Sequence, residues 1–349
     1  MKTILIIALS IIVSASVSAQ TFITQAKPSG EKLWGYINQD GETVIKPMYK
    51  KCYQFAENGL APIYESKKYF FINTNGEKLK TEIVGFRLIE GFIGFGGIQG
   101  YTDGMVAVMK DKKWGFLNTE GKLAIEVKYD MVRIFNNGNA VVKKGDDFFV
   151  INKSGEEIKI EGNDIIDVKG FTEGLAPYSN IDKKHGFIDV NGKVIITAQF
   201  VSVGYFNDGL AWAKTESKKL GYINKKGEWV IEPKFLSAKD FESVSGLARI
   251  KTASGWAYVN KSGEIINIAD TELWSDFSDG LAKGRKDGKF GYFDNEGSWV
   301  IAAEYEAGRD FVNGFAAVKK GGKWGFINNT GEWVIEAKFA GVKDLERVE

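Results

Sequence analysis

The sequence predicts an all-β fold, an array of about nine repeats of ~35 residues that each form a three-stranded β-meander. Three residue patterns recur in register along the chain and carry this prediction. The composition agrees with it, because 41 glycines among 349 residues and an aromatic fraction of 13% are typical of short strands joined by many tight turns. A repeat of this size cannot bury a core alone, so we expect neighbouring repeats to stack.

The first pattern is a bulky residue, most often tryptophan, at the start of a strand. It recurs at Trp34, Tyr69, Trp114, Phe148, His185, Leu220, Trp256, Phe290 and Trp324. The second pattern is a glycine seven residues later, as at Gly331. The third is an upstream aromatic residue followed by a turn and a glycine, as from Phe311 to Gly314. Three anchors in register exclude a chance repeat and indicate that the bulky position is a packing stripe between repeats.

Each repeat divides into three expected strands. The first resembles Gly-Leu-Ala, the second reads Trp-Gly-Phe-Ile or a close variant, and the third is an apolar segment before a lysine and an aromatic residue. The Asn-x-x-Gly between the second and third strands is typical of a hairpin, because the glycine takes a positive φ and the asparagine caps the turn. In the last repeat Gly325 lacks a Cβ, so we expect a close approach there, such as an aromatic side chain of a neighbouring repeat.

The recurring word resembles that of the WG-repeat family, also called KWG repeats. It stands as Lys-Leu-Trp-Gly-Tyr-Ile-Asn at 32–38, as Lys-Trp-Gly-Phe-Leu-Asn at 113–118 and as Lys-Trp-Gly-Phe-Ile-Asn at 323–328. The resemblance covers the chain from Lys32 to Phe339. It implies a β-rich repeat array of a kind common in bacterial envelope and secreted proteins, and it supplies no shared catalytic residues.

Two arrangements of the array remain open. A β-propeller closes the repeats into a ring, whereas a superhelix or solenoid leaves them open. Blades usually have four strands, and rings usually have about four to eight blades. This chain has about nine short repeats of three expected strands. The open superhelix is therefore favoured over the closed β-propeller.

The first 19 residues read as a secretory signal peptide. Lys2 gives a positive start, residues 4–17 are apolar but too short to span a bilayer, and Val-Ser-Ala at 17–19 is a small-residue cleavage signal. The alternative is an N-terminal anchor helix. We expect an exported protein, whether periplasmic, on the cell surface or secreted, with no membrane span after cleavage. The repeat array is expected to occupy residues 20–349, with an insertion at 80–104.

The sequence offers no catalytic or metal-binding constellation. His185 is the one histidine and stands in the bulky packing position, and Cys52 is the one cysteine, which excludes an internal disulfide. The glycine-rich stretch at 91–100 lacks the Gly-Lys-Ser/Thr of a phosphate loop and reads as an inserted loop. We therefore expect no enzyme activity, no cofactor and no metal. The carboxylates that precede turn glycines read as turn formers, at Asp103, Glu173, Asp208 and Asp279.

Two sets of residues are candidate binding groups. A basic residue recurs two positions before the upstream bulky anchor, at Arg133, Lys169, Lys239, Arg309 and Lys343. Stacking the repeats would align this set as a basic ladder able to bind an anionic glycan or an acidic partner protein. The alternative is a solvated edge that guards the strands against aggregation. The second set follows turn glycines by two residues and would form stacking platforms if exposed, or core if buried: Trp229, Trp299 and Trp333.

These observations favour an exported, non-enzymatic scaffold that mediates protein–protein interaction at the cell envelope. The alternative is a carbohydrate-binding or envelope structural protein, which rests on the tryptophans and the basic ladder. The 46 basic and 45 acidic residues are balanced, which gives no drive toward nucleic acid. The partner is expected to be a protein or an anionic glycan, and the chain itself to be a monomer.

Overall fold

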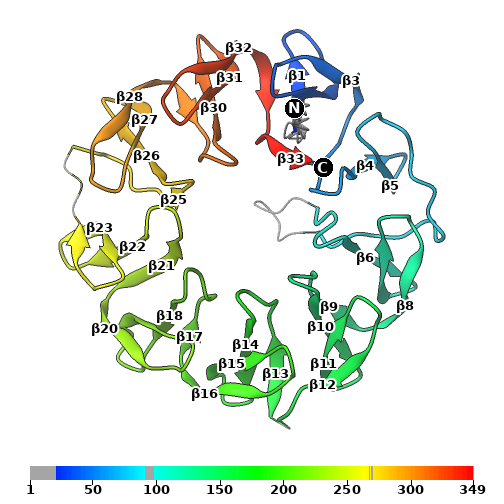
Figure 1. The fold of residues 1–349 in the computed structure, drawn as a ribbon, viewed down its shortest axis with the longest axis vertical. Coiled ribbons are helices and arrows are strands. Elements are labelled where there is room, and N and C mark those ends of the chain that lie inside the picture. Colours follow the sequence, from blue (N-terminus) through cyan, green and yellow to red (C-terminus); the bar gives the residue numbers. More distant parts are fainter. Residues whose placement is uncertain (1–20, 91–97, 163, 267, 269, 349) are drawn as a thin grey trace, which may run out of the picture.

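The computed structural model describes residues 21–90, 98–162, 164–266, 268 and 270–348. Within these ranges the strands form eight antiparallel sheets, the largest of which joins the first and last strands of the chain. They divide into nine units, here called blades 1 to 9, which follow one another around a ring (Figure 1). The predicted all-β repeat fold is confirmed. The predicted signal peptide at 1–19 lies outside the described residues, as do residues 91–97 of the glycine-rich stretch.

The strands are assigned to blades in chain order. Blade 1 holds β1 (Thr21–Pro28), β2 (Trp34–Asn38) and β3 (Thr43–Tyr49), blade 2 holds β4 (Ala61–Glu65) and β5 (Lys68–Ile72), and blade 3 holds β6 (Met105–Lys110), β7 (Lys113–Asn118) and β8 (Leu123–Tyr129). Blade 4 holds β9 (Met131–Val132), β10 (Asn139–Lys144), β11 (Asp147–Asn152) and β12 (Glu157–Lys159), and blade 5 holds β13 (Ile165–Val168), β14 (Leu175–Asn180), β15 (His185–Asp189) and β16 (Val194–Phe200). Blade 6 holds β17 (Ser202–Val203), β18 (Ala211–Lys214), β19 (Leu220–Ile223) and β20 (Trp229–Phe235), and blade 7 holds β21 (Ser237–Glu242), β22 (Leu247–Thr252), β23 (Gly255–Asn260) and β24 (Ile265–Ile266). Blade 8 holds β25 (Phe277–Ser278), β26 (Leu281–Lys286), β27 (Lys289–Phe293) and β28 (Trp299–Tyr305), blade 9 holds β29 (Ala307–Gly308), β30 (Phe315–Lys320), β31 (Lys323–Asn328) and β32 (Trp333–Val342), and β33 (Glu346–Val348) ends the described chain.

A short inner strand completes most blades and was not expected from the sequence. In blade 8, for example, the order is β25-β26-β27-β28, with β25 nearest the centre of the ring and β28 at the rim (Figure 1). The chain leaves each rim strand almost directly into the inner strand of the next blade, since β16 ends at Phe200 and β17 begins at Ser202. Because the rim strand of one blade continues into the inner strand of the next with no long connection, ~35 residues suffice for a four-stranded blade.

The ends of the chain meet, so the open superhelix favoured from the sequence is wrong. Strand β1 pairs on one edge with β2 and on the other with β32, where Ala26 faces Val342. It also pairs with β33, where Phe22 faces Arg347. The C-terminal segment thereby supplies the inner strand that blade 1 lacks. Closure satisfies the N–H and C=O groups that an open array would leave along the edge of β1.

The glycine of the repeated Trp-Gly word is required by the rim strand of its own blade. A Cβ built on Gly325 would lie closer than 3.0 Å to the carbonyl oxygen of Ile335 in β32, nearer than real Cβ atoms come. The register between β31 and β32 shifts at this point, which turns the carbonyl over the glycine. The expected close approach is therefore present, but the approaching group is a backbone carbonyl of the same blade and not a neighbour's aromatic ring.

The same glycine predicts which blades have a full rim strand. Six blades carry it, and in each the rim strand has seven or more residues and an isoleucine carbonyl over the glycine: Gly35, Gly115, Gly186, Gly221, Gly291 and Gly325. The other three blades have Phe70, Phe149 or Ala257 there. Among the described residues, blade 2 forms only an isolated bridge at the rim, while β12 and β24 have three and two residues.

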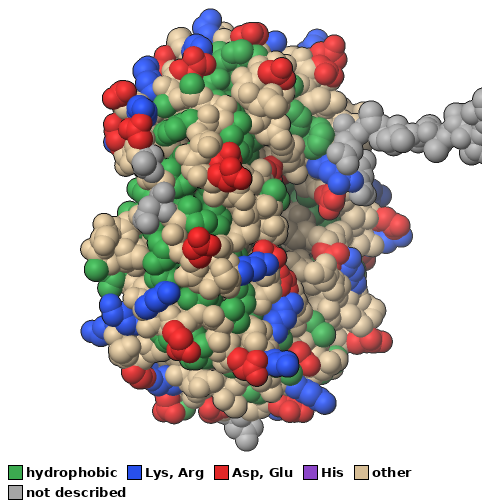
Figure 2. Space-filling view, turned by 60° about the vertical axis from the view of Figure 1, so that its left-hand side comes forward, with side chains coloured by type: hydrophobic (Ala, Val, Ile, Leu, Met, Phe, Trp, Pro, Cys, Tyr) green, Lys and Arg blue, Asp and Glu red, His purple; other side chains and the backbone are tan. Residues whose placement is uncertain are grey.

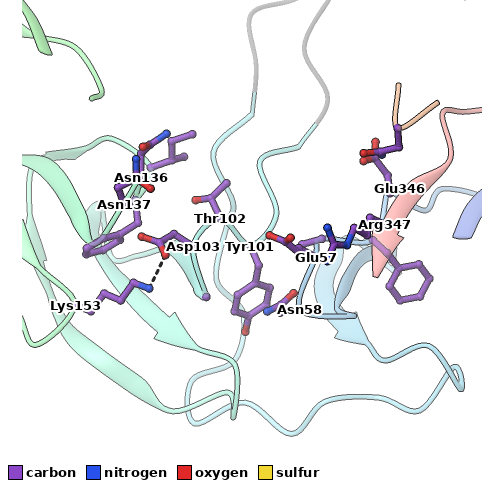
Figure 3. Close-up of a pocket in the computed structure, with 16 residues that line it drawn as sticks. Glu57, Asn58, Tyr101, Thr102, Asp103, Asn136, Asn137, Lys153, Glu346 and Arg347 are labelled. Atoms are coloured by element: carbon purple, nitrogen blue, oxygen red, sulfur yellow. Dashed lines mark hydrogen bonds and ion pairs between the residues drawn. The ribbon is translucent and has the colours of Figure 1, made fainter. Parts of the chain in front are cut away.

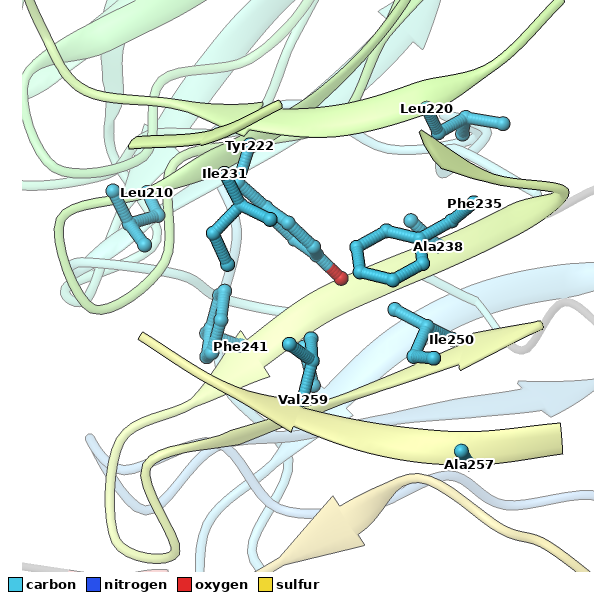
Figure 4. Close-up of a cluster of buried hydrophobic side chains, with 11 residues drawn as sticks. Leu210, Leu220, Tyr222, Ile231, Phe235, Ala238, Phe241, Ile250, Ala257 and Val259 are labelled. Atoms are coloured by element: carbon cyan, nitrogen blue, oxygen red, sulfur yellow. The ribbon is translucent and has the colours of Figure 1, made fainter. Parts of the chain in front are cut away.

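The hydrophobic core lies between blades. The cluster at the boundary of blades 6 and 7 joins Tyr222 and Ile231 of one blade to Phe241, Ile250 and Val259 of the other (Figure 4). Tyr222 and Ile250 are fully buried. Since every blade shares its apolar residues with its neighbours, the stability of one blade depends on the next.

Buried tyrosine hydroxyls also join successive blades. Tyr222 in blade 6 donates to the carbonyl oxygen of Lys239 in blade 7 at 2.8 Å, and Tyr292 in blade 8 donates to that of Arg309 in blade 9 at 2.6 Å. Burial is the main cause that raises the pKa of both phenols above the ordinary range, so both remain protonated donors.

We expect Tyr222→Phe to lower the free energy of unfolding by about 1–2 kcal/mol, because the carbonyl oxygen of Lys239 would lose its partner in a buried setting. Chemical denaturation monitored by circular dichroism measures the change. Tyr205→Phe is the control, since the Tyr205 side chain is exposed and should change the free energy by less than about 0.5 kcal/mol. Equal effects of the two substitutions would contradict the role assigned to the Tyr222 hydroxyl.

The described parts of the predicted insertion at 80–104 lie along blade 3. The N–H of Glu82 donates to the carbonyl oxygen of Gly121 at 2.8 Å, and Arg87 forms a bridge with Met109 of β6. Blade 3 thus gains inner-strand pairing from the segment that follows blade 2.

Candidate functional site

The turns that follow the inner strands surround a polar cavity of about 810 Å³ on the inner side of the ring (Figure 3). These turns contain the aromatic-turn-Gly pattern found in the sequence. The residues that line the cavity and are labelled in Figure 3 come from three blades and the C-terminal segment that closes the ring. They are Glu57 and Asn58 of blade 2, Tyr101, Thr102 and Asp103 of blade 3, Asn136, Asn137 and Lys153 of blade 4, and Glu346 and Arg347 of the closing segment. Amides, carboxylates and two cations dominate the surface, so this cavity can recognise a polar partner through hydrogen bonds.

Residues before the turn glycines hold the cavity wall in place. Asp103 has a φ of 52° and Asn137 a φ of 46°, a left-handed conformation that Asp and Asn adopt more readily than most residues. The Asp103 carboxylate accepts the backbone N–H of Gly138 in the next blade and lies 2.6 Å from Lys153 Nζ (Figure 3). Glu173 repeats the arrangement with the N–H of Gly209. The predicted turn formers therefore also link neighbouring blades.

The environment of Asp103 favours its charged form. Burial opposes ionisation, but Lys153 and the Gly138 N–H together outweigh it and lower the pKa of the Asp103 carboxyl below its ordinary value. A carboxyl group with a lowered pKa in the folded state stabilises the protein above its unfolded pKa. That contribution is lost as the pH falls through the folded pKa.

We expect Asp103→Asn to lower the free energy of unfolding by about 0.5–1 kcal/mol at neutral pH, since the ion pair is partly exposed. The difference from the unsubstituted protein should shrink as the pH is lowered from about 5 toward 2, where Asp103 itself becomes protonated. Urea unfolding at a series of pH values measures it. A difference that stays constant or grows on acidification would contradict the assigned ionisation of Asp103.

Neither the histidine nor the cysteine is part of a reactive cluster in the part of the chain that the structure describes. Burial, followed by the nearby Lys169, lowers the pKa of His185, which sits half-buried at the start of β15. Burial raises the pKa of the half-buried Cys52 thiol to about 11, which disfavours the nucleophilic thiolate. No group of three or more His, Cys, Asp or Glu suited to a metal ion occurs among the described residues.

The predicted basic ladder is divided by ion pairs. Arg133 Nη2 lies 2.8 Å from Asp167 Oδ1 of the next blade, and Lys169 Nζ lies 2.6 Å from the other oxygen of the same carboxylate. Arg309 makes a bidentate contact with Asp344 in the closing segment. Arg133 and Arg309 are therefore engaged in joining blades. Binding of an anionic partner by the ladder as a whole stays a prediction.

Two exposed members of the ladder have no ion-pair partner among the described residues. Lys239 and Lys343 form no ion pair with any described residue. Lys343 and Arg309 line a second cavity, of about 620 Å³, between blades 1 and 2. Sequence reasoning missed the aspartates that oppose the ladder, although an aspartate directly before the bulky anchor recurs visibly at Asp240, Asp276, Asp310 and Asp344.

The three candidate tryptophans pack at blade boundaries. Each is half-buried at the start of a rim strand. Trp229 meets Phe200 of the preceding blade edge-on, with ring centroids 5.6 Å apart, and Trp333 meets Tyr305 of its preceding blade at 5.9 Å. Trp299 packs against Phe293 of its own blade at 5.7 Å. This packing matches the core alternative, and sugar stacking by these residues stays a prediction.

Nine blades closed by the pairing of both chain ends define a β-propeller built from short repeats. The model of the WG containing repeat family matches residues 34–69, 114–146, 186–218, 221–256, 290–324 and 324–346, which is more than half of the chain. The chain belongs to this family. The six matches begin at or beside the Trp-Gly word of the six blades that carry the glycine, and these are the blades with a full rim strand.

Comparison with other proteins supports the fold alone. No curated protein matches the chain. The crystal structure of the eukaryotic initiation factor is similar with a TM-score of 0.63 and 13% identity, over 93% of this chain and 97% of that one. BamB from Moraxella catarrhalis has a TM-score of 0.45 and 10% identity over 80% and 94%, and the dihydro-heme d1 dehydrogenase NirN has 0.44 and 12% over 92% and 74%. At these TM-scores the last two likenesses say nothing about function.

Proposed function

We propose that the chain is an exported, non-enzymatic scaffold that binds a partner protein at the cell envelope through the polar turns at the centre of its ring. The observation that carries this proposal is the cavity of about 810 Å³, whose wall comes from blades 2, 3, 4 and 9 and from the closing segment. A surface assembled from several repeats can vary at each turn without disturbing the blade cores.

The charge distribution supports a protein partner. Glu57 and Arg347 are exposed at the cavity, and amide side chains also line it, so the surface offers both donors and acceptors. On the face shown in Figure 2, basic and acidic side chains are interspersed instead of forming a field of one sign. Such a surface favours specific polar docking over binding to a polyanion. In the described residues no helix is long and apolar enough to cross a membrane.

Crosslinking in intact cells followed by purification and mass spectrometry tests the proposal. The double substitution Glu57→Lys with Arg347→Glu reverses both charges at the cavity and should abolish recovery of a specific envelope protein. The matched control is Glu232→Lys with Lys234→Glu, a charge reversal on the exposed side of the rim strand β20. Recovery of the same partner by all three proteins would place binding elsewhere, and recovery of no enriched protein would overturn the proposal.

A further inference from the structure

One position on the strand that precedes the bulky-residue strand is polar in blades 1, 6, 7 and 8. It is apolar in the other five blades, where it is Pro62, Ala107, Val141, Pro177 or Ala317. In blades 6, 7 and 8 this position faces the strand that carries Tyr222, Tyr258 or Tyr292. Its occupants are Trp212, Arg249 and Lys283, and each meets the aspartate directly before the bulky anchor of the next blade: Asp240, Asp276 and Asp310. A polar bridge therefore crosses each of these three boundaries.

In blade 1 the position is polar, but its side chain forms no such bridge to blade 2. Gln25 takes the same position, since it faces Tyr36 in β2. The residue directly before the anchor Phe55 is Gln54, which donates to Glu346 at 2.6 Å and leaves Gln25 without this partner. Gln25 is 3% exposed, and its amide nitrogen donates to the carbonyl oxygen of Cys52 at 3.2 Å. Its Oε1 atom has no hydrogen-bond partner among the described residues.

An unpartnered, buried acceptor is costly, so a donor is expected to reach it. Gln25 lines the second cavity, of about 620 Å³, which lies at this boundary and adjoins the central one. Among the four polar residues at this position, Gln25 is the one without the bridge, and it lines an open cavity. In a protein of similar repeats, such a departure is where a specific site is expected.

The cavity also carries excess positive charge. Lys50, Lys51 and Lys343 line it, and none forms an ion pair with a described residue. Arg309 is neutralised by Asp344. Burial, with the neighbouring Asp344, raises the pKa of Glu346, the carboxylate in the lining, which weakens its ability to balance the three lysines.

We propose that the cavity between blades 1 and 2 binds an acidic sugar. The carboxylate would lie among Lys50, Lys51 and Lys343, a sugar hydroxyl would donate to Gln25 Oε1, and the apolar face of the sugar would rest on Trp34, which also lines the cavity. The three requirements of the cavity are an anion, a donor and a small apolar face, and a hexuronic acid supplies all of them on one ring. This site adjoins the partner surface proposed above and shares Glu346 with it, but sugar binding here does not depend on the partner protein.

Isothermal titration of the purified chain with glucuronic acid and with oligogalacturonate tests the proposal. Binding should weaken at least tenfold in Lys51→Gln with Lys343→Gln, two exposed positions whose substitution leaves the core intact. It should weaken similarly in Gln25→Leu, which keeps the volume of the side chain and removes the acceptor. Lys239→Gln is the matched control, because Lys239 occupies the ladder position of blade 7, is exposed and lies at neither cavity. It should bind like the unsubstituted protein.

The probes separate the alternatives. Glucose binding as tightly as glucuronic acid would overturn the role of the lysines, and equal binding of inorganic phosphate or triglutamate would overturn the assignment of a sugar. Absence of binding to any acidic sugar would overturn the proposal entirely. If Gln25→Leu unfolds at a lower temperature than the unsubstituted protein, the test rests on the double variant Lys51→Gln with Lys343→Gln. Unchanged sugar binding by that double variant would contradict the site.

Discussion

Gly221→Ala should destabilise the protein by about 3 kcal/mol or more. The new Cβ would lie closer than 3.0 Å to the carbonyl oxygen of Ile231 and to the backbone of Glu232 and Pro233. All three belong to the rim strand β20, so no flexible side chain can move aside. The rim strand must detach from β19, and Trp229 at its start would lose its contact with Phe200. Thermal and urea unfolding measure the loss.

Gly170→Ala is the matched control for this substitution. Gly170 does not adopt a left-handed backbone, and the nearest atom to an added Cβ is Arg133 Cβ at 4.0 Å. The change should cost less than about 0.5 kcal/mol or be slightly stabilising. Ala257 occupies the Trp-Gly position in blade 7, where the described rim strand has only two residues, and it shows that alanine is tolerated when the rim strand is short. Equal stability of the Gly221 and Gly170 variants would contradict the steric role of the Trp-Gly glycine.

Removal of residues 343–349 should cost about 5 kcal/mol and loosen the closure of the ring, because β32 alone would then pair with β1. The deletion takes away β33 and with it Leu345 and Val348, which are 1% and 5% exposed and contribute about 1.5–3 kcal/mol each by burial. It also leaves Arg309 without Asp344. The truncated chain should unfold at a lower temperature and show a larger radius of gyration in small-angle scattering.

The control for the truncation is Arg347→Ala, which changes an exposed side chain within β33 and keeps the strand. Its unfolding free energy should differ from that of the unsubstituted protein by less than about 0.5 kcal/mol. A truncated chain with unchanged stability and radius would show that the closing segment does not hold the ring together.

Local chemistry made most of the blade predictable from the sequence. The Asn-x-x-Gly hairpin is present as expected: in the last blade the side-chain oxygen of Asn328 accepts the N–H groups of Thr330 and Glu332, and Gly331 has a φ of 87°. The close approach at Gly325 was also predictable, because a glycine amid bulky apolar residues signals crowding. The identity of the crowding group was not, since it arises from a register shift between two strands, which residue type alone does not specify.

Closure was harder to predict because it depends on the two ends together. The sequence after Val342 repeats the start of a unit, with Lys343 and Leu345 in the ladder and anchor positions. The first repeat, conversely, lacks such a start. The segment after Val342 therefore matches the start that the first repeat lacks, and that match was the available signal. Counting three strands per repeat favoured an open array because it placed the whole of each repeat in one blade. In the structure the chain passes from the rim strand β16 of blade 5 directly into the inner strand β17 of blade 6, so one repeat contributes strands to two blades.

The candidate sites were only partly predictable. The basic positions were visible as a periodic pattern, but whether a cation is free or paired depends on the opposing residue one blade away, as Arg133 and Asp167 show. The tryptophans were ambiguous for the same reason, because burial of Trp229 is decided by Phe200 in another repeat. The missing bridge at Gln25 becomes visible only once equivalent positions of neighbouring blades are brought together.

Amide hydrogen exchange in β1, followed by nuclear magnetic resonance, tests ring closure most directly. The N–H groups of a strand point alternately to its two edges, so a strand paired on one edge protects only alternate amides. Since β1 is paired with β2 on one edge and with β32 and β33 on the other, amides directed to both edges should exchange slowly. In the chain lacking residues 343–349, protection should persist on the β2 edge and at residues 26–28, which pair with β32, and should fall at residues 21–23, which pair with β33. Rapid exchange of alternate β1 amides in the full chain would contradict the closed ring.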